Sequence, residues 1–308
     1  MRRLYKQLSA AVLAATMMLS LPAAGLKVKA DGVTGANPSD VYVSFGADLT
    51  DSEKSTVTSL MGIQESDLAN YTVGQITNDD EKKYLGEYLD ANIIGSRALS
   101  SVIVVLGDDG DGIDVETKNI SYCTPGMYTN ALITAGIENA DVIVAGPYEI
   151  TGTAALVGAM KAYADLTGEE ISQESMDAAV NELVVTSAMA EDENSEDVEE
   201  LIAYVKAKVV EGGLNSEEEI GEAVQEGVNR LGISITDTEK ESIISLMQKI
   251  GELDLDIDNM KEQAGELFDK LEEMGINKES TKNFFQKIWE AIKSFFDSLF
   301  GEEEVQSE

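Results

Sequence analysis

The chain of 308 residues carries 22 Lys and Arg against 58 Asp and Glu and has no His, so its formal net charge is −36. The lack of His excludes Ser-His-Asp and Cys-His catalysis and His-ligated zinc, and the strong negative charge repels phosphate backbones, which argues against nucleic acid as a partner. An enzyme of this composition would have to use carboxylates, Lys, Tyr, Ser, Thr or backbone amides.

The first thirty residues have the three-part pattern of a secretory signal peptide. A basic head, Met1–Lys6, precedes the apolar stretch Leu8–Leu21, and Val28–Ala30 offers small residues for cleavage. We therefore expect a secreted protein, extracellular or associated with the cell wall, with no transmembrane span after cleavage. Without the five basic residues of this leader, 17 Lys and Arg face 58 Asp and Glu, a formal charge of −41.

From residue 31 to residue 190, short β-rich runs alternate with helical patterns. We expect strands at 41–45, 101–106, 113–120 and 140–145, and helices from Thr50 onward, at 124–137 and at 154–166. Thr50 and Glu53 form a capping-box pattern, which marks a helix start. Strands alternating with helices predict an α/β (or α+β) N-terminal domain.

An acidic loop lies between the second and third predicted strands, and we expect it to turn the chain back as a hairpin. It gathers five carboxylates within nine residues: Asp108, Asp109, Asp111, Asp114 and Glu116. Oxygen-rich loops can bind calcium weakly outside cells, although this spacing does not fit an EF-hand. Solvated acids around a Gly-Asp-Gly turn explain the same residues without metal. We expect no cofactor, and weakly bound calcium is the one that the sequence leaves open.

Two segments of the first domain are candidate walls of a ligand pocket. The run 142–154 passes from a strand through a Gly-bearing loop into a helix, and 124–128 opens another helix. The free amides of a helix start could hold a carboxylate or phosphate, but plain helix capping explains the same residues. The candidate ligand-binding residues are Thr124, Tyr128, Asn130, Thr151 and Thr153. Cys123, the only cysteine, has no His to activate it and is expected to be a buried structural thiol.

An acidic stretch at 191–200 is expected to be a linker into an all-α helical region, 201–276. Apolar residues recur there at helical spacing, with candidate helices at about 195–211, 216–231, 236–250 and 257–274. The chain then continues into a further helix, 277–301, and an acidic tail, 302–308.

The predicted helix 277–301 is amphipathic, with its aromatic residues on one face. That face comprises Phe284, Phe285, Ile288, Trp289, Ile292, Phe295, Phe296 and Phe300, together with Leu299. It could dock on the protein's own helices, bind a partner protein or a second copy, or lie on a membrane surface. The polar face mixes Lys with acidic residues, whereas membrane-surface helices usually carry Lys and Arg across that face.

Several segments together resemble a known family. These segments are 46–50, 94–101, 112–117, 127–137, 151–156 and 182–186. They are similar to the YpuA-like family of secreted proteins of Gram-positive bacteria, a domain of unknown function, over about residues 41–271. The resemblance implies an extracellular location, but it brings no activity, ligand or catalytic residue with it.

Two hypotheses about function remain open from the sequence. The leading one is a non-catalytic extracellular or envelope-associated binding protein, with the aromatic helix 277–301 as its adhesive element. The alternative is a hydrolase of cell-wall or other extracellular polymers that uses carboxylate, Thr or Tyr chemistry near 124–128 and 151–153. A cleft with two facing acids would favour the second hypothesis.

Overall fold

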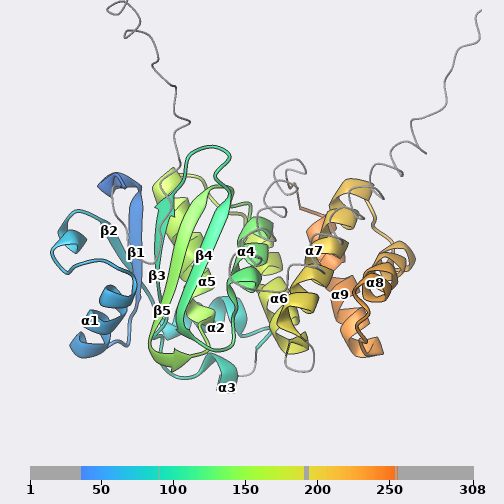
Figure 1. Cartoon of the computed structure of the whole chain (residues 1–308), viewed down its shortest axis with the longest axis horizontal. Helices are drawn as coiled ribbons and strands as arrows, with labels where there is room; N and C mark the ends of the chain where they lie inside the picture. The colour runs from blue at the N-terminus through green and yellow to red at the C-terminus, as the bar shows by residue number, and fades with distance from the viewer. Residues whose placement is uncertain (1–35, 90, 191–193, 254, 256–308) are drawn as a thin grey trace, which may run out of the picture.

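A five-stranded mixed sheet forms the centre of the first part of the chain (Figure 1). The computed structural model describes residues 36–89, 91–190, 194–253 and 255. The strand order is β2-β1-β3-β5-β4. The strands are β1 (Val41–Gly46), β2 (Thr72–Ile76), β3 (Ser101–Leu106), β4 (Ile113–Ile120) and β5 (Ala140–Ile150).

Four of the five strands point the same way. β1 runs parallel to β2, β4 runs parallel to β5, and β3 is antiparallel to both β1 and β5. The carboxyl ends of β1, β2, β4 and β5 therefore meet at one edge of the sheet. A helix follows each of these strands, so helix amino ends gather at this edge, which is where ligands commonly bind in open α/β sheets.

Helices cover both faces of the sheet. The helices of this part are α1 (Asp51–Leu60), α2 (Asn78–Leu85), α3 (Ala91–Ile94), α4 (Pro125–Thr134), α5 (Thr153–Thr167) and α6 (Gln173–Met189), with short 3-10 turns at Pro38–Asp40 and Asp67–Ala69. Val57 of α1 and Met61 pack with Phe45 and Ile103 on one face. The other face packs against α4 and α5, whose inner side chains include Leu132.

The remaining described helices form a second core around α6. They are α7 (Ser195–Gly212), α8 (Glu217–Leu231) and α9 (Asp237–Gly251). Their inner side chains, such as Leu201, Val224 and Leu246, pack with Ala178 and Met189 of α6. The opposite side of α6 packs against the core of the sheet, and Figure 1 shows α6 standing between the two parts.

The predicted order of an α/β part followed by helices is confirmed in its coarse form, with three corrections. β3 and β4 do not form a hairpin, because β5 lies between them. β2, α2, α3 and α6 were not predicted. The expected linker 191–200 overlaps α7, which begins at Ser195 and buries Glu199 and Glu200. The predicted helices 257–274 and 277–301 lie outside the described residues.

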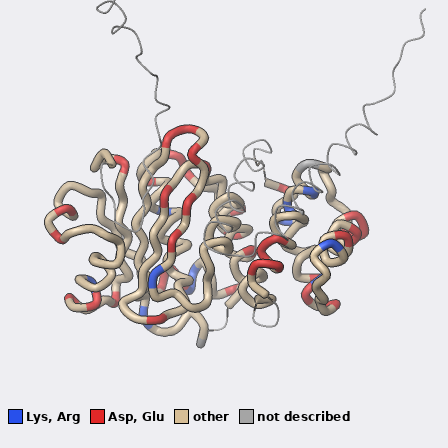
Figure 2. The backbone as a smooth tube through the Cα atoms, viewed as in Figure 1, with Lys and Arg blue, Asp and Glu red and all other residues tan. Residues whose placement is uncertain are grey.

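Asp and Glu positions are spread widely along the described backbone, and Lys and Arg positions are few (Figure 2). Among the described residues, no helix is both long enough and apolar enough to cross a membrane. The predicted strands at 101–106 and 113–120 match β3 and β4 residue for residue. The capping box of Thr50 and Glu53 forms as predicted.

Candidate functional site

A pocket of about 290 Å³ opens at the edge of the sheet where β5 ends and β3 begins. It brings together the first turn of α2, the loop from α3 to β3 and the turn that opens α5. We call it the Glu81 pocket. Its lining comprises Glu81, Ile93, Ile94, Gly95, Ser96, Arg97, Leu99, Ser100, Ile150, Thr151, Gly152 and Thr153.

The Glu81 carboxyl group is the central polar feature of this pocket. Glu81 is only 2% exposed. Thr153 donates its hydroxyl to Oε1 at 3.2 Å, and Asn78 donates its side-chain amide to Oε2 at 3.3 Å. Burial penalises the charged form and raises the pKa of Glu81 to about 7, although both hydrogen bonds act in the opposite direction. Glu81 can therefore exchange its proton close to neutral pH.

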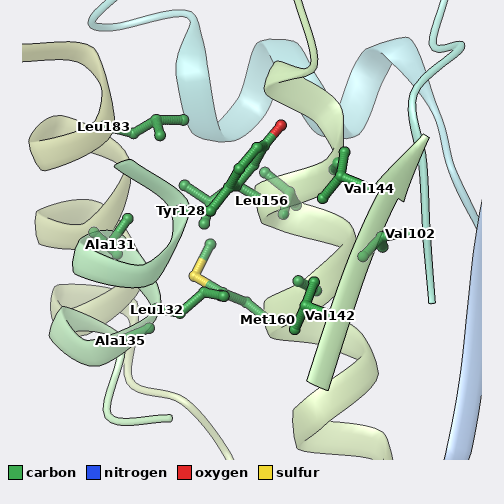
Figure 3. Packing of buried hydrophobic residues seen from close by; sticks show 14 of the residues in the cluster. Val102, Tyr128, Ala131, Leu132, Ala135, Val142, Val144, Leu156, Met160 and Leu183 are labelled. Carbon is green, nitrogen blue, oxygen red and sulfur yellow. The ribbon is translucent and has the colours of Figure 1, made fainter. Parts of the chain in front are cut away.

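The turn Thr151–Gly152–Thr153 forms the wall opposite Glu81 and is held from beneath by Tyr128. The Tyr128 hydroxyl donates to the Gly152 carbonyl oxygen at 2.7 Å. Gly152 has φ +93°, and a Cβ there would lie 2.5 Å from the Tyr128 hydroxyl, so only glycine fits. Figure 3 shows Tyr128 projecting from α4 among apolar side chains that include Leu156. The pocket wall therefore rests directly on the core.

Arg97 lies at the rim of the pocket and is half-exposed. Its Nη2 donates to Glu53 Oε2 at 2.9 Å and to the Asp48 carbonyl oxygen at 2.7 Å. Asp48 in turn accepts the Ala98 amide through its carboxylate at 2.8 Å. These contacts tie the loop before β3 to the turn between β1 and α1. The guanidinium charge is thus largely balanced by Glu53.

The structure separates the predicted ligand-binding residues into two groups. Thr151 and Thr153 line the Glu81 pocket, and Tyr128 supports it while being fully buried. Thr124 and Asn130 lie instead where α4 meets α7. Sequence reasoning missed Glu81, the residue that faces the two threonines.

At the α4–α7 contact, Thr124 caps α4 and donates its hydroxyl to the Glu199 carboxylate. The Asn130 amide donates to the Glu199 carbonyl oxygen at 3.3 Å. A Cβ at Gly126 would lie 2.0 Å from Glu199 Oε2, so glycine makes room for this carboxylate. Burial raises the pKa of Glu199 and of Glu200 to about 7. These residues join the two parts of the molecule and do not line the Glu81 pocket.

A buried ion pair lies about two turns further along α7, at the same contact with α4. Lys206 of α7 donates to Glu182 Oε1 of α6 at 2.8 Å, and both side chains are almost completely buried. The ammonium group also donates to the Asn130 carbonyl oxygen at 2.9 Å and to the Thr134 hydroxyl at 3.1 Å. Burial lowers the pKa of Lys206, while Glu182 acts in the opposite direction. This network fixes α4, α6 and α7 relative to one another.

Hydrogen bonds from backbone amides to the side chains of Asp111 and Asn139 hold the turn of the acidic loop. Asp111 accepts the Asp108 amide at 2.9 Å, and Asn139 accepts the amides of Gly110 and Gly112, each at 3.0 Å. In the part of the chain that the structure describes, no three His, Cys, Asp or Glu side chains are grouped as metal ligands would be.

The other four acids of the predicted calcium site are divided between strand β4 and the loop before it. Glu116 of β4 pairs with Lys118, and Asp114 belongs to the same strand. Asp109 and Asp108 lie in the loop itself.

Cys123 is buried, and desolvation raises the pKa of its thiol to about 12. A thiol this resistant to ionisation is a poor nucleophile, because the thiolate is the reactive form. The placement supports the predicted structural role.

The residues between Phe284 and Phe300 that the sequence predicts to bind a partner lie outside the described residues. A local signal could have placed Glu81 in the first turn of a helix. Thr77 and Asp80 form a capping box at the start of α2, and Glu81 directly follows Asp80. The pairing of Glu81 with Thr153 has no such signal, since it joins residues 72 positions apart.

Comparisons with known proteins identify the family. The chain is 37% identical over 291 residues to the uncharacterized protein YpuA of Bacillus subtilis, covering 92% of this chain and 96% of that protein. No solved structure matches the chain significantly. The model of the family described as "Protein of unknown function (DUF1002)" matches residues 45–267. The chain therefore belongs to the DUF1002 family.

Proposed function

We propose that the protein is a secreted binding protein of the extracellular space or cell envelope that holds a small ligand in the Glu81 pocket. The observation that carries this proposal is the pocket itself, which combines a buried carboxyl group with an opposed hydroxyl, that of Thr153, at the carboxyl edge of the sheet. The leader-like segment 1–30 supports the extracellular location.

The pocket is built in a way that suits binding. Glu81 and Thr153 hold each other by a hydrogen bond, and Tyr128 fixes the Gly152 carbonyl from below. Groups that are already held in place lose little conformational entropy when a ligand arrives, so a preformed pocket gains affinity. Apolar side chains, among them Leu99 and Ile150, line the same space and would contact the ligand body.

The test is a solution NMR titration of the chain from residue 31 onward. Small amines, amino acids, amino sugars, neutral sugars and carboxylic acids would be added one at a time. The proposal expects at least one class to move the amide signals of Gly95, Ser100 and Thr151–Thr153 while leaving those of α8 unchanged. Shifts scattered over the whole surface, or none at the pocket with any class, would refute it.

A second function rests on one observation within the same pocket. A carboxyl group with a pKa of about 7 lies 3.2 Å from the Thr153 hydroxyl, which is the arrangement of a general base and the nucleophile that it activates. This arrangement supports the alternative of a hydrolase of extracellular polymers. Incubation with wall polymer and product analysis would reveal turnover. Glu81→Gln and Thr153→Val should each abolish that turnover if the alternative is right.

The aromatic helix 277–301 remains the proposed adhesive element, on the evidence of its sequence pattern alone. Chains ending at Glu308 and at Ile276 would be compared by size-exclusion chromatography with light scattering, with and without liposomes. Self-association or lipid binding by the longer chain alone would support the proposal. If both chains are monomers and neither binds liposomes, the helix is not an adhesive element.

A further inference from the structure

Glu81 is a buried carboxyl group whose partners are both neutral. Its oxygens accept from the Thr153 hydroxyl and the Asn78 amide. Among the described residues, no Lys or Arg nitrogen forms a salt bridge with it. An ionised carboxylate has about four acceptor positions, so two remain for a ligand. A buried carboxylate is stable when a cation pairs with it, and here the pocket provides the space for one.

The charged neighbours leave that position open to a cation. Arg97 at the rim is engaged by Glu53 and by the Asp48 carbonyl oxygen. Lys82, next to Glu81 on the exposed side of α2, and the Asp48 carboxylate act on Glu81 in opposite directions. At long range, the strongly negative surface attracts small cations and raises their local concentration.

The rest of the pocket suits a short apolar stem. Ile93, Ile94, Leu99 and Ile150 line it together with the small residues of the loop before β3. Its volume of about 290 Å³ lies at the lower limit for drug-sized ligands. The lining therefore favours a small molecule with one polar end and a short hydrocarbon portion.

We propose that the Glu81 pocket binds a small organic cation, with a primary ammonium group against the Glu81 carboxylate and a short apolar stem along Leu99 and Ile150. This inference rests on the proposed function and specifies its ligand class. Because Glu81 holds its proton near neutral pH when the pocket is empty, an ammonium ligand must displace that proton. Binding should strengthen as the pH rises from 5.5 to 8.

The experiment is isothermal titration calorimetry on the chain from residue 31 onward with n-butylammonium, n-butanol, butyrate and 4-aminobutyrate. We expect n-butylammonium to bind at least tenfold more tightly than n-butanol, which has the same stem without the charge. At pH 6, heats measured in buffers of different ionisation enthalpy should show release of close to one proton. This last measurement needs no variant.

The matched variants are Glu81→Gln, which removes the charge while keeping the shape, and Glu87→Gln, an exposed glutamate of the same segment outside the pocket. Glu81→Gln should lower the affinity for n-butylammonium at least tenfold, and Glu87→Gln should leave that affinity unchanged. Tighter binding of 4-aminobutyrate than of n-butylammonium would support a zwitterionic ligand whose carboxylate reaches Arg97. Weaker binding of 4-aminobutyrate would support a simple amine.

Equal binding of n-butylammonium and n-butanol, absence of proton release at pH 6, or no effect of Glu81→Gln would each overturn the cation assignment. If n-butanol or butyrate alone binds and moves the pocket signals by NMR, the assignment fails while the proposed binding function stands. If no compound of the wider NMR titration reaches the pocket, the proposed function fails as well.

Discussion

At the scale of single residues, three glutamates held inside the fold share one electrostatic feature. Glu81, Glu199 and Glu200 each have a pKa raised to about 7, with burial as the largest cause. In the unfolded chain a glutamate titrates near pH 4.3. The folded state therefore keeps protons that the unfolded state has already lost between these two values, so raising the pH favours unfolding.

The first prediction concerns Glu199. We expect the free energy of unfolding to fall as the pH rises from about 4.5 to about 7, and then to level off. Glu199 alone accounts for about 4 kcal/mol of that fall at most. Glu199→Gln keeps a carbonyl acceptor for Thr124 but cannot ionise, so the variant should be more stable than the parent at pH 8.

Urea denaturation followed by circular dichroism at pH 5, 6, 7 and 8 measures this dependence. Glu222→Gln, an exposed glutamate on α8, is the control and should follow the parent at every pH. If the free energy of unfolding of Glu199→Gln falls with pH as steeply as that of the parent, Glu199 is not the source of the pH dependence.

The second prediction concerns the buried ion pair. Lys206→Met leaves Glu182 buried with no cation, and losing one partner of a buried pair typically costs about 3–5 kcal/mol. The double variant Lys206→Met/Glu182→Leu removes both charges and should recover a large part of that loss. Lys208→Met, which breaks a half-exposed pair with Glu226, should cost about 1 kcal/mol or less.

Urea denaturation at pH 7 measures all three variants. Equal losses in the single and double variants at Lys206 would mean that packing, and not an unpaired carboxylate, sets the cost. In that case, the Thr134 and Asn130 contacts would have to account for the stability of the α4–α7 interface.

At the scale of secondary structure elements, local signals predicted most helices and the central strands. Thr50 with Glu53 and Thr236 with Glu239 form capping boxes, whose residues are neighbours in the sequence. β2 escaped prediction because it is an edge strand with exposed residues and an internal Gly74, so it lacks an alternating apolar pattern. α6 escaped because both its sides are buried, which removes the amphipathic pattern.

Only part of the pocket could be predicted from the sequence. Thr151 and Thr153 follow a buried strand and precede a helix, and this local order pointed to a pocket wall. Glu81 reaches Thr153 because β2 directs α2 toward the amino end of α5, a consequence of strand order. Strand order depends on pairing between distant segments, as the misassigned β3–β4 hairpin also shows.

At the scale of the whole molecule, α6 joins the two parts of the described structure into one unit. One side of it carries Val180 and Leu183 into the core of the sheet, and the other carries Ala178 and Met189 into the core of α7–α9. The ion pair of Glu182 with Lys206 crosses the same boundary. Neither core can separate from α6 without exposing buried surface.

The third prediction follows from this shared helix. Amides of β3 and of α7 should exchange their hydrogens through the same global opening, with equal free energies within error. Native-state hydrogen exchange at increasing urea concentrations measures both. A lower opening free energy for the helices α7–α9 than for the sheet would show that they unfold as a separate unit.

The proposed cation site depends on Glu81, a buried carboxyl group that must ionise when an ammonium group binds in the pocket. The most direct measurement is a carbon-13 NMR pH titration of the Glu81 side-chain carboxyl, assigned with Glu81→Gln, without ligand and with saturating n-butylammonium. We expect a pKa of about 7 for the Glu81 carboxyl in the empty pocket and a clearly lower pKa with the ammonium bound. An ordinary value near 4.3 in the empty pocket, or a value that n-butylammonium does not change, would contradict it.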